Sequence, residues 1–381
     1  MSLDSRRSWK NTENNCRCRV GWKSLLSEHI INYFKEKNLE PGLSFIICCH
    51  NSSKRLTSTL SHLAAQNIQQ EILWEVIIVD NASTDDTGQC ALSIWDRIGK
   101  PTTMRVITEP RIGIGYARYK GFEEAKYEFI CFIDDDNWVA SDYASTGFEF
   151  MQRHSEVGAC GSLNEVVSDI ALPWWFEKYQ RSYAVGPQSE EPGDVTENRG
   201  VLWSAGLIVR RFALQDLLDA GFRPMVIGAR GEKVIMRGED YEMCLAMRLR
   251  GWKLWYEPKL TLKHYMPPER LNWKYLRRLL RGVGASDPTL RPYYLAITRK
   301  KDFWRRQIIA LFMGMMKSPM KLLLATFCSC EGDHEVLMIE RSFGFIWALM
   351  RIRKNYDRLF LDFNRSGWVT LHNLTAERHE P

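Results

Sequence analysis

The chain has 381 residues, of which 45% are hydrophobic and 12% aromatic, so it can form one large or two small globular domains with a sizeable core. Its formal net charge of +6, from 52 basic and 46 acidic residues, is too small to require nucleic acid as a partner. Its 10 cysteines form no Cys-x-x-Cys pair, which argues against a zinc site or a thioredoxin-like motif and favours a reduced, cytosolic compartment.

The first 40 residues are predicted to form an N-terminal extension. Their polar, basic start, Met1–Arg19, lacks the apolar core of a signal peptide. The longest strongly apolar stretch of the chain, Ile308–Met316, is shorter than the roughly 18 to 20 residues that a membrane-spanning helix needs. We therefore expect a cytoplasmic protein, and peripheral contact with the inner face of the cell membrane stays open.

Strands and helices are predicted to alternate between residues 41 and 137. Apolar runs indicate strands at Leu43–Cys49, Val76–Val79, Met104–Ile107 and Phe129–Ile133, with helices at Ser53–Gln66, Cys90–Ile98 and Gly115–Ala125 between them. Strands that are apolar on both faces and separated by helices are typical of a parallel sheet covered on both sides. Ligands of such sheets bind beyond the carboxyl ends of the strands, where the loops are expected to form one crevice.

The pattern is less regular from residue 138 to residue 270, where a helix is predicted near Asp240–Arg250. The region 271–381 is predicted to be mainly helical, with basic and aromatic residues in the stretches Trp273–Arg281, Asp302–Met316 and Phe345–Arg353. Basic amphipathic helices can bind an anionic membrane, and ordinary helix packing explains the same pattern equally well. The expected division is therefore 1–40, 41–270 and 271–381, with the middle part divided into halves 41–137 and 138–270.

Three consecutive aspartates, Asp134, Asp135 and Asp136, follow the fourth predicted strand. Side chains alternate along an extended segment, so Asp134 and Asp136 can share a face while Asp135 points elsewhere. Two carboxylates two positions apart suit a hard divalent cation such as Mg²⁺ or Mn²⁺, which also accepts phosphate oxygens. The alternative is a solvated acidic turn, because short motifs have a high false-positive rate.

The acidic triplet is one of five short segments that occur together in a fixed order. They are residues 44–51, 78–85, 109–118, 134–136 and 238–240. With these segments, the chain resembles inverting glycosyltransferases of family 2 with the GT-A fold, roughly from Leu43 to Gly284. The resemblance implies an α/β domain with a mixed, mostly parallel sheet flanked by helices, a Rossmann-like nucleotide half and a helical C-terminal extension. From Pro173 to Gly284, the chain also resembles the bacterial subgroup associated with surface polysaccharide assembly.

The resemblance implies transfer of a sugar from a nucleoside diphosphate sugar, a UDP sugar by preference, to a saccharide or lipid-linked saccharide acceptor. It implies Mn²⁺ or Mg²⁺ as cofactor, because a cation neutralises the charge on the departing diphosphate. Two other functions stay open. A nucleotidyltransferase also combines carboxylates with a metal and a nucleotide, and a catalytically silent sugar-binding or scaffold protein could have the same fold.

By resemblance, the nucleotide sugar is expected to contact seven residues: Cys49, Asn51, Asp80, Gly113, Arg118, Asp134 and Asp135. Asp80 is expected to accept a hydrogen bond from the uracil imide, and a helix N-cap is its alternative role. Arg118 is expected near a phosphate, although an arginine on a helix is often only solvated. Gly113-Ile114-Gly115 is not a Rossmann fingerprint, so a nicotinamide cofactor is not expected.

Asp240 is the expected catalytic base, since inversion is a single displacement in which one carboxylate takes the proton of the attacking hydroxyl. The start of the predicted helix is expected to keep this carboxylate ionised, and a structural N-cap is the alternative. Glu239 is expected to orient either the acceptor or the metal site. The segment Ser204-Ala205-Gly206 departs from the Gly-Ala-Gly of the resembled subgroup, so the acceptor side is the least defined.

Asp136 is the first expected metal ligand, and Asp134 either shares the metal or contacts the ribose. His264 resembles a histidine that completes the metal shell in some relatives, and a structural histidine is the alternative. Trp174 and Trp175 are expected to stack on acceptor sugars, because aromatic rings match the apolar faces of pyranoses. A place in the core is the alternative for both, since tryptophan is largely buried on average.

Overall fold

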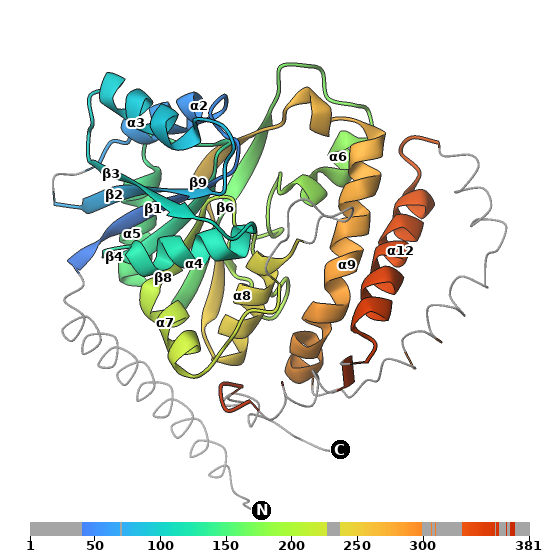
Figure 1. The fold of residues 1–381 in the computed structure, drawn as a ribbon. Coiled ribbons are helices and arrows are strands. Elements are labelled where there is room, and N and C mark those ends of the chain that lie inside the picture. The colour runs from blue at the N-terminus through green and yellow to red at the C-terminus, as the bar shows by residue number, and fades with distance from the viewer. Residues whose placement is uncertain are drawn as a thin grey trace, which may run out of the picture.

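The computed structural model describes residues 40–68, 71–226, 237–298, 306, 309, 330–354, 356–357, 363 and 366–369. In this part of the chain, a nine-stranded sheet is flanked by helices on both faces (Figure 1). The strand order is β3-β2-β1-β4-β8-β6-β9-β5, and β7 pairs with β9. This arrangement confirms the predicted α/β class with a mixed, mostly parallel sheet.

The first half of the sheet holds four parallel strands. Its elements are β1 (Glu40–Cys49), α2 (Leu56–Ala64), β2 (Leu73–Asn81), α3 (Thr87–Arg97), β3 (Thr103–Glu109), α4 (Ile114–Glu124) and β4 (Tyr127–Asp134). The register places Cys49 beside Asp80 and Cys48 beside Asp134. The carboxyl ends of these strands therefore lie at one edge of the sheet, as the alternation of strands and helices predicts.

The second half is mixed. Its elements are β5 (Asn137–Val139), α5 (Tyr143–Arg153), β6 (Val157–Val167), α6 (Phe176–Tyr179), β7 (Gly193–Asp194), β8 (Leu207–Arg210), α7 (Arg211–Asp219), α8 (Glu239–Leu249) and β9 (Lys253–Tyr265). Two 3-10 helices, Gln180–Tyr183 and Pro268–Arg270, lie in the connections. Strand β8 runs antiparallel to both β4 and β6, so it joins the two halves into one sheet.

Alternate side chains of the strands pack into two separate cores. Phe45 and Ile47 of β1 belong to the core that α2, α3 and α5 cover. Ile46 of the same strand belongs to the core on the other face, with residues of α4, α7 and α8. The strands are apolar on both faces because both faces are buried, and this burial holds the carboxyl ends of the strands in fixed positions.

Two long helices, α9 (Trp273–Ile297) and α12 (His334–Ile352), lie side by side at the C-terminal end of the described chain (Figure 1). Asn272 caps α9 by accepting a hydrogen bond from the backbone N–H of Tyr275, and Asp333 caps α12 in the same way. Most of the predicted helix 302–316 lies outside the described residues. None of the described helices combines the length and the apolar character needed to cross a membrane.

Candidate active site

A cavity of about 490 Å³ lies at the carboxyl ends of the parallel strands, between the sheet and the helices α8 and α9. Its wall includes Cys48, Arg118, Asp134, Asp136, Arg181, Trp203, Ser204, Arg237, Glu239, Asp240, His264 and Arg270. These residues come from segments that are up to 222 positions apart in the chain (Cys48 and Arg270). The fold therefore brings the acidic triplet, Arg118 and Asp240 to one place.

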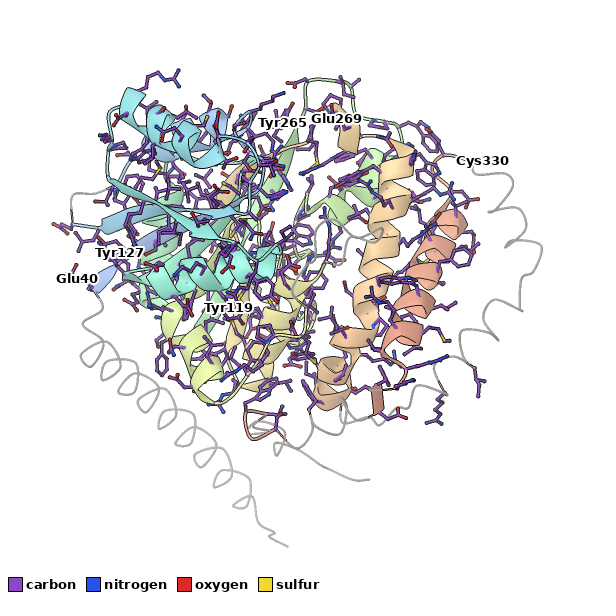
Figure 2. The ribbon with its side chains drawn as sticks, in the orientation of Figure 1. Glu40, Tyr119, Tyr127, Tyr265, Glu269 and Cys330 are labelled. Atoms are coloured by element: carbon purple, nitrogen blue, oxygen red, sulfur yellow. The ribbon has the colours of Figure 1, made fainter. Side chains whose placement is uncertain are left out.

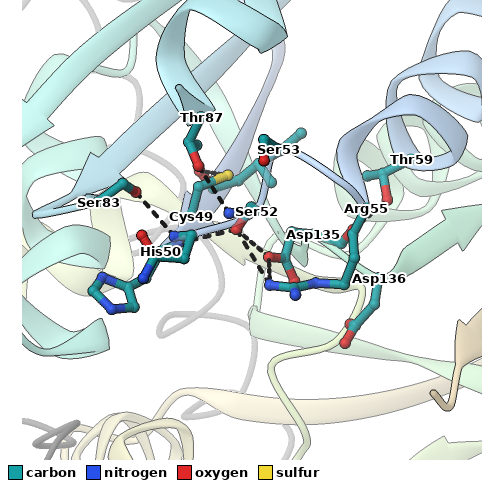
Figure 3. A network of polar contacts seen from close by, with 12 residues as sticks. Cys49, His50, Ser52, Ser53, Arg55, Thr59, Ser83, Thr87, Asp135 and Asp136 are labelled. Carbon is teal, nitrogen blue, oxygen red and sulfur yellow. Dashed lines mark hydrogen bonds and ion pairs between the residues drawn. The ribbon is translucent and has the colours of Figure 1, made fainter. Parts of the chain in front are cut away.

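The middle aspartate of the triplet, Asp135, belongs to a network of hydrogen bonds with the loop after β1 (Figure 3). The carboxylate of Asp135 accepts hydrogen bonds from the hydroxyl of Ser52 and from Nη2 of Arg55, the latter at 2.5 Å. Thr59 Oγ1 donates to the backbone oxygen of Asp135 at 2.9 Å. Asp135 reaches the cavity wall, but its carboxylate ties the acidic turn to the β1–α2 loop.

Asp136 contacts an arginine and a histidine at the cavity wall. Its oxygens lie 2.8 Å from Nη1 of Arg270 and 3.4 Å from Nε2 of His264. Burial alone disfavours the charged form, but Arg270 and His264 hold the pKa of Asp136 below its ordinary value. Arg270 lies in the turn between β9 and α9, which Tyr265 and Glu269 mark in Figure 2.

Asp134 differs from Asp136 in its electrostatic surroundings. Burial raises the pKa of Asp134, and Arg118, whose Nη2 is 3.9 Å from the carboxylate, only partly opposes this effect. Two carboxylates that are two positions apart thus have pKa values that are shifted in opposite directions. A site with this asymmetry can bind a positive charge at Asp134 while Asp136 is already neutralised by its neighbours.

The donor set of Asp134, Asp136 and His264 fits a divalent cation chemically, because it combines hard carboxylate oxygens with one imidazole nitrogen. Nε2 of His264 faces Asp136, and its Nδ1 is buried with no hydrogen-bond partner among the described residues. In the described ranges, no three His, Cys, Asp or Glu side chains are already gathered around a common point. A cation at Asp136 would therefore compete with Arg270.

Asp240 is the second residue of α8, which begins with Glu239 directly after Gly238. The φ of Gly238, 112°, lies in the left-handed region that favours glycine. The carboxylate of Asp240 accepts hydrogen bonds from the backbone N–H groups of Ser204, at 3.1 Å, and Tyr241, at 2.9 Å. These two bonds fix the orientation of the carboxylate at the cavity wall. An acceptor hydroxyl in the cavity can reach it.

The ionisation of Asp240 differs from the expectation that the helix start keeps it charged. Burial, together with the negative charge of Glu239, raises the pKa of Asp240 to about 6. Arg118 and the two N–H groups oppose this shift without cancelling it. Desolvation therefore outweighs the helix N-terminus at this position, and the carboxylate has the pKa of a base that works near neutral pH.

Arg118 contacts two parts of the cavity wall, the acidic turn at Asp134 and the start of α8 at Glu239. Its guanidinium donates to Oε1 of Glu239 at 2.9 Å and to the hydroxyl of Ser204 at 2.7 Å. Burial disfavours its charge, but Glu239 and Asp134 raise the pKa of Arg118 above its ordinary value. Arg118 is therefore a buried, paired cation rather than a solvated helix residue. The hydroxyl that it contacts exists only because Ser204 stands where the resembled subgroup has glycine.

The residues predicted for the nucleotide lie around the ends of β1 and β2. Oδ1 of Asn51 accepts a hydrogen bond from the backbone N–H of Thr84 at 2.8 Å, so the first loop is attached to the second. Asp80 caps its own loop by accepting from the N–H of Ser83 at 3.2 Å. Asp80 thus makes a structural contact and still leaves carboxylate lone pairs for a ligand.

Asn81 was not predicted as a site residue. Its side chain attaches the loop that follows β3 to the end of β2. Its amide group donates to the backbone oxygens of Glu109, at 3.1 Å, and Arg111, at 2.6 Å. Its side-chain oxygen accepts from the N–H of Gly113 at 2.9 Å. The only sequence signal is its position directly after Asp80 at the end of an apolar run.

Two predicted contact residues have side chains in the core. Cys49 is 1% exposed and belongs to the core under α2 and α3, while the preceding Cys48 lines the cavity. The prediction for the Cys49 side chain was therefore displaced by one residue, which in a strand reverses the face. Trp175 is 1% exposed and packs edge-on against Trp273. Trp175 is therefore a core residue, which was the alternative to sugar stacking.

Trp174 lies apart from the cavity wall. It is 74% exposed, and its ring covers Gly332 in the turn before α12. Stacking of Trp174 on an acceptor sugar therefore stays a prediction.

Arg270 was missed by the sequence analysis, because no local pattern marks a residue that pairs with Asp136 across 134 positions.

Comparisons with known proteins indicate a glycosyltransferase. Residues 44–218 match the model of the family described as Glycosyl transferase family 2. The match agrees with the resemblance to family 2 glycosyltransferases.

The chain is similar to proteins named poly-beta-1,6-N-acetyl-D-glucosamine synthase. The one from Staphylococcus aureus (strain COL) is 21% identical over 263 residues, which cover 68% of this chain and 58% of the relative. The one from Staphylococcus epidermidis is 22% identical over 263 residues, with the same two shares. The chain thus spans 58% of the length of these relatives.

A solved structure supports the fold. The mannosyltransferase PcManGT from Pyrobaculum calidifontis, in complex with GDP-Man and Mn²⁺, superposes with a TM-score of 0.52 at 15% sequence identity. The match covers 86% of this chain and 97% of that chain. The GT-A architecture predicted from the sequence is therefore confirmed.

Proposed function

We propose that the chain moves a sugar from a UDP sugar to a saccharide or lipid-linked saccharide acceptor, with inversion and with Mn²⁺ or Mg²⁺ at the acidic turn. The supporting observation is the convergence of the acidic triplet, Arg118 and Asp240 on one cavity. In this proposal, residues 41–270 form the catalytic domain, with a nucleotide half (41–137) and an acceptor half (138–270). Residues 1–40 and 271–381 flank it.

The chemical step is a single displacement in which Asp240 acts as the base. The acceptor oxygen forms a bond to the anomeric carbon, the bond from that carbon to the diphosphate breaks, and the hydroxyl proton passes to Asp240. The N–H groups of Ser204 and Tyr241 orient the carboxylate for this transfer. The ion pair between Glu239 and Arg118 positions both side chains beside it.

The leaving diphosphate needs positive charge, and the donor side of the cavity supplies it. Asp136, Asp134 and His264 would hold the cation, which as a Lewis acid neutralises charge on the departing oxygens. Arg118 adds a fixed positive charge on the same side. The loops that carry Asn51, Asp80 and Gly113 bind the nucleoside in this proposal.

The names of the staphylococcal relatives make UDP-N-acetylglucosamine the first donor to test. The experiment is a screen of nucleotide sugars with Mn²⁺, in which binding and hydrolysis are measured for the wild type and for Asp240→Asn. We expect one donor to bind and to turn over. We expect Asp240→Asn to reduce turnover about 10²- to 10⁴-fold with little change in donor affinity, because the base acts only on the acceptor.

Asp142→Asn is the control, since Asp142 is exposed before α5 and forms no side-chain cap. Equal turnover of the wild type and Asp240→Asn would identify a silent binding protein or a different base. Release of pyrophosphate from a nucleoside triphosphate and a sugar phosphate would instead identify a nucleotidyltransferase. No binding of any nucleotide sugar would contradict the proposal entirely.

A further inference from the structure

The charges on the cavity wall are unevenly distributed. Most of the wall's carboxylates are already paired with arginines: Asp135 with Arg55, Asp136 with Arg270, Glu239 with Arg118, and Asp287 with Arg341. Asp134 and Asp240 are the two carboxylates to which the proposed function assigns a ligand and a proton. Two arginines of the wall, Arg181 and Arg237, remain to be explained.

Arg181 and Arg237 donate only to uncharged oxygens among the described residues. Nη2 of Arg181 donates to the backbone oxygen of Gln188 at 3.1 Å. Nη2 of Arg237 donates to the hydroxyl of Tyr275 at 3.3 Å. Each guanidinium has five N–H donors, so both retain several donors for a ligand. Both side chains are exposed to the solvent of the cavity, whereas Arg118 on the donor side is buried.

A third arginine increases the positive charge behind this part of the wall. Arg199 donates to the same oxygen of Gln188 as Arg181, at 2.6 Å, and its guanidinium lies 4.4 Å from the ring centre of Trp203. Burial lowers the pKa of Arg199, and the like charge of Arg181 acts in the same direction. Two guanidinium groups that share one carbonyl oxygen repel each other, and a bound anion would relieve this repulsion.

The ligand that fits these arginines is an oxyanion. Guanidinium groups bind phosphate through paired, directional hydrogen bonds, and several arginines suit a group with more than two oxygens. A neutral saccharide would desolvate the arginines without compensating their charge, which is unfavourable. The donor diphosphate is not this ligand in our scheme, because the proposed function assigns it to Arg118 and to the cation at the acidic turn.

We propose that the acceptor carries a phosphate group that Arg181 and Arg237 bind, so that the attacking hydroxyl is held beside Asp240. This inference rests on the proposed transferase function and specifies its acceptor class. The phosphate belongs either to the saccharide itself or to a lipid to which the saccharide is linked. Arg181 and Arg237 act as binding residues for the acceptor, and Arg199 positions Arg181 through their shared carbonyl.

The test uses probes that differ only in the phosphate. With UDP and Mn²⁺ at saturating concentration, affinities are measured for octyl β-glucoside and its 6-phosphate. Vesicles of phosphatidylcholine with and without phosphatidic acid report a lipid phosphate. We expect the phosphorylated member of one pair to bind at least about tenfold more tightly, a difference that two charge-assisted contacts readily supply. Whichever pair shows this preference identifies the source of the phosphate.

Arg181→Gln and Arg237→Gln should each reduce the preference, and the double variant should abolish it. Arg181→Lys and Arg237→Lys, which keep the charge, should retain part of it. Arg97→Gln is the control, because Arg97 is exposed at the end of α3 and outside the cavity wall. Thermal unfolding and UDP affinity of each variant confirm that the fold and the donor side are intact.

Equal affinity for both members of both pairs would overturn the inference, as would a preference that survives in the double variant. Failure of the proposed function has a different signature. In that case, the wild type would bind no nucleotide sugar, whatever its response to the phosphate probes.

Discussion

Opposing influences set the ionisation of the carboxylate of Asp240. Burial and Glu239 raise its pKa to about 6, and Arg118 with the N–H groups of Ser204 and Tyr241 limits the rise. A general base is most effective when its pKa lies near the working pH, because it is then both deprotonated and basic. The environment of Asp240 therefore suits proton abstraction better than an exposed aspartate would.

The pKa of Asp240 predicts how kcat/KM for transfer falls at low pH, which is the acid limb of the pH profile. Since Asp240 must be deprotonated, kcat/KM for transfer should rise with an apparent pKa of about 6. Glu239→Gln removes a negative charge from the neighbourhood and frees Arg118 to stabilise the carboxylate, so the limb should move to lower pH. The measurement is the rate from about pH 5 to about pH 8 for both proteins. A limb that Glu239→Gln leaves in place would show that another group titrates.

At the residue scale, sequence reasoning placed side chains at the right edge of the sheet but could not predict their pairing. Asp134 was found because it follows the fourth predicted strand. Asp240 was found because it lies in a segment that carries the family resemblance, at the start of a predicted helix. The ion pairs of Arg118 with Glu239, across 121 positions, and of Arg270 with Asp136 depend on how distant segments pack. The direction of the pKa shift at Asp240 depends on burial, which no local pattern contains.

The contact between α9 and α12 depends on two glycines. A Cβ added to Gly284 would lie 1.9 Å from the backbone oxygen of Arg341, and one added to Gly344 would lie 1.9 Å from that of Arg281. The two helix backbones therefore touch directly at this crossing. Glu340 of α12 strengthens the contact by accepting from Nε of Arg277, at 2.8 Å, and of Arg281, at 2.7 Å.

Gly284→Ala and Gly344→Ala should therefore both destabilise the protein. Alanine is the better helix former, but here its methyl group would have to displace backbone, and overpacking of this kind typically costs about 1–3 kcal/mol. The midpoint of chemical unfolding should fall for both variants. Gly367→Ala is the control, because no atom lies within 4 Å of its added Cβ. Unchanged or increased stability of Gly284→Ala would show that the helices can separate at no cost.

At the element scale, the apolar runs predicted the four parallel strands and their helices, because each element has a buried face with its own periodicity. The predicted helix Trp273–Arg281 proved to be the first part of α9, which continues to Ile297 through Pro288 and Pro292. Prolines usually end or kink helices, so local chemistry argues against this continuation. Packing against α8 and α12 supports it, and this packing is invisible in the sequence.

Across the whole molecule, the acidic turn is electrically balanced by the protein itself. Arg55 pairs with Asp135, and Arg270 pairs with Asp136. Three adjacent carboxylates without such partners would repel one another and would need a cation for folding. Because the arginines supply this charge, folding and metal binding are separable in this protein.

Removal of divalent cations should therefore abolish transfer but leave the fold intact. After treatment with EDTA, we expect the thermal midpoint to change little and the transfer activity to return when Mn²⁺ or Mg²⁺ is added. Asp136→Asn should prevent this recovery, while Asp142→Asn, an exposed substitution, should not. Full activity in EDTA would refute a role for the cation, and cooperative unfolding in EDTA would refute the separation of folding from metal binding.

Peripheral membrane contact stays a prediction. The structure shows that two basic residues of α9 are already paired within the protein. Arg277 and Arg281, two of the basic residues expected to face a membrane, are engaged with Glu340 between α9 and α12. An arginine in such a pair contributes less to binding an anionic surface than a free one. Contact of α9 with lipid would therefore depend on other side chains.

The amide group of Asn81 orders the segment 109–113 during folding, before any ligand binds. Its three hydrogen bonds attach that segment to β2 in the absence of any ligand. Restricting a residue to one backbone conformation costs roughly 1–2 kcal/mol, and for this segment the cost is met during folding. A donor that arrives at the cavity beside Ile114 consequently meets a preorganised surface, and its binding energy is not reduced by the entropy of arranging that loop.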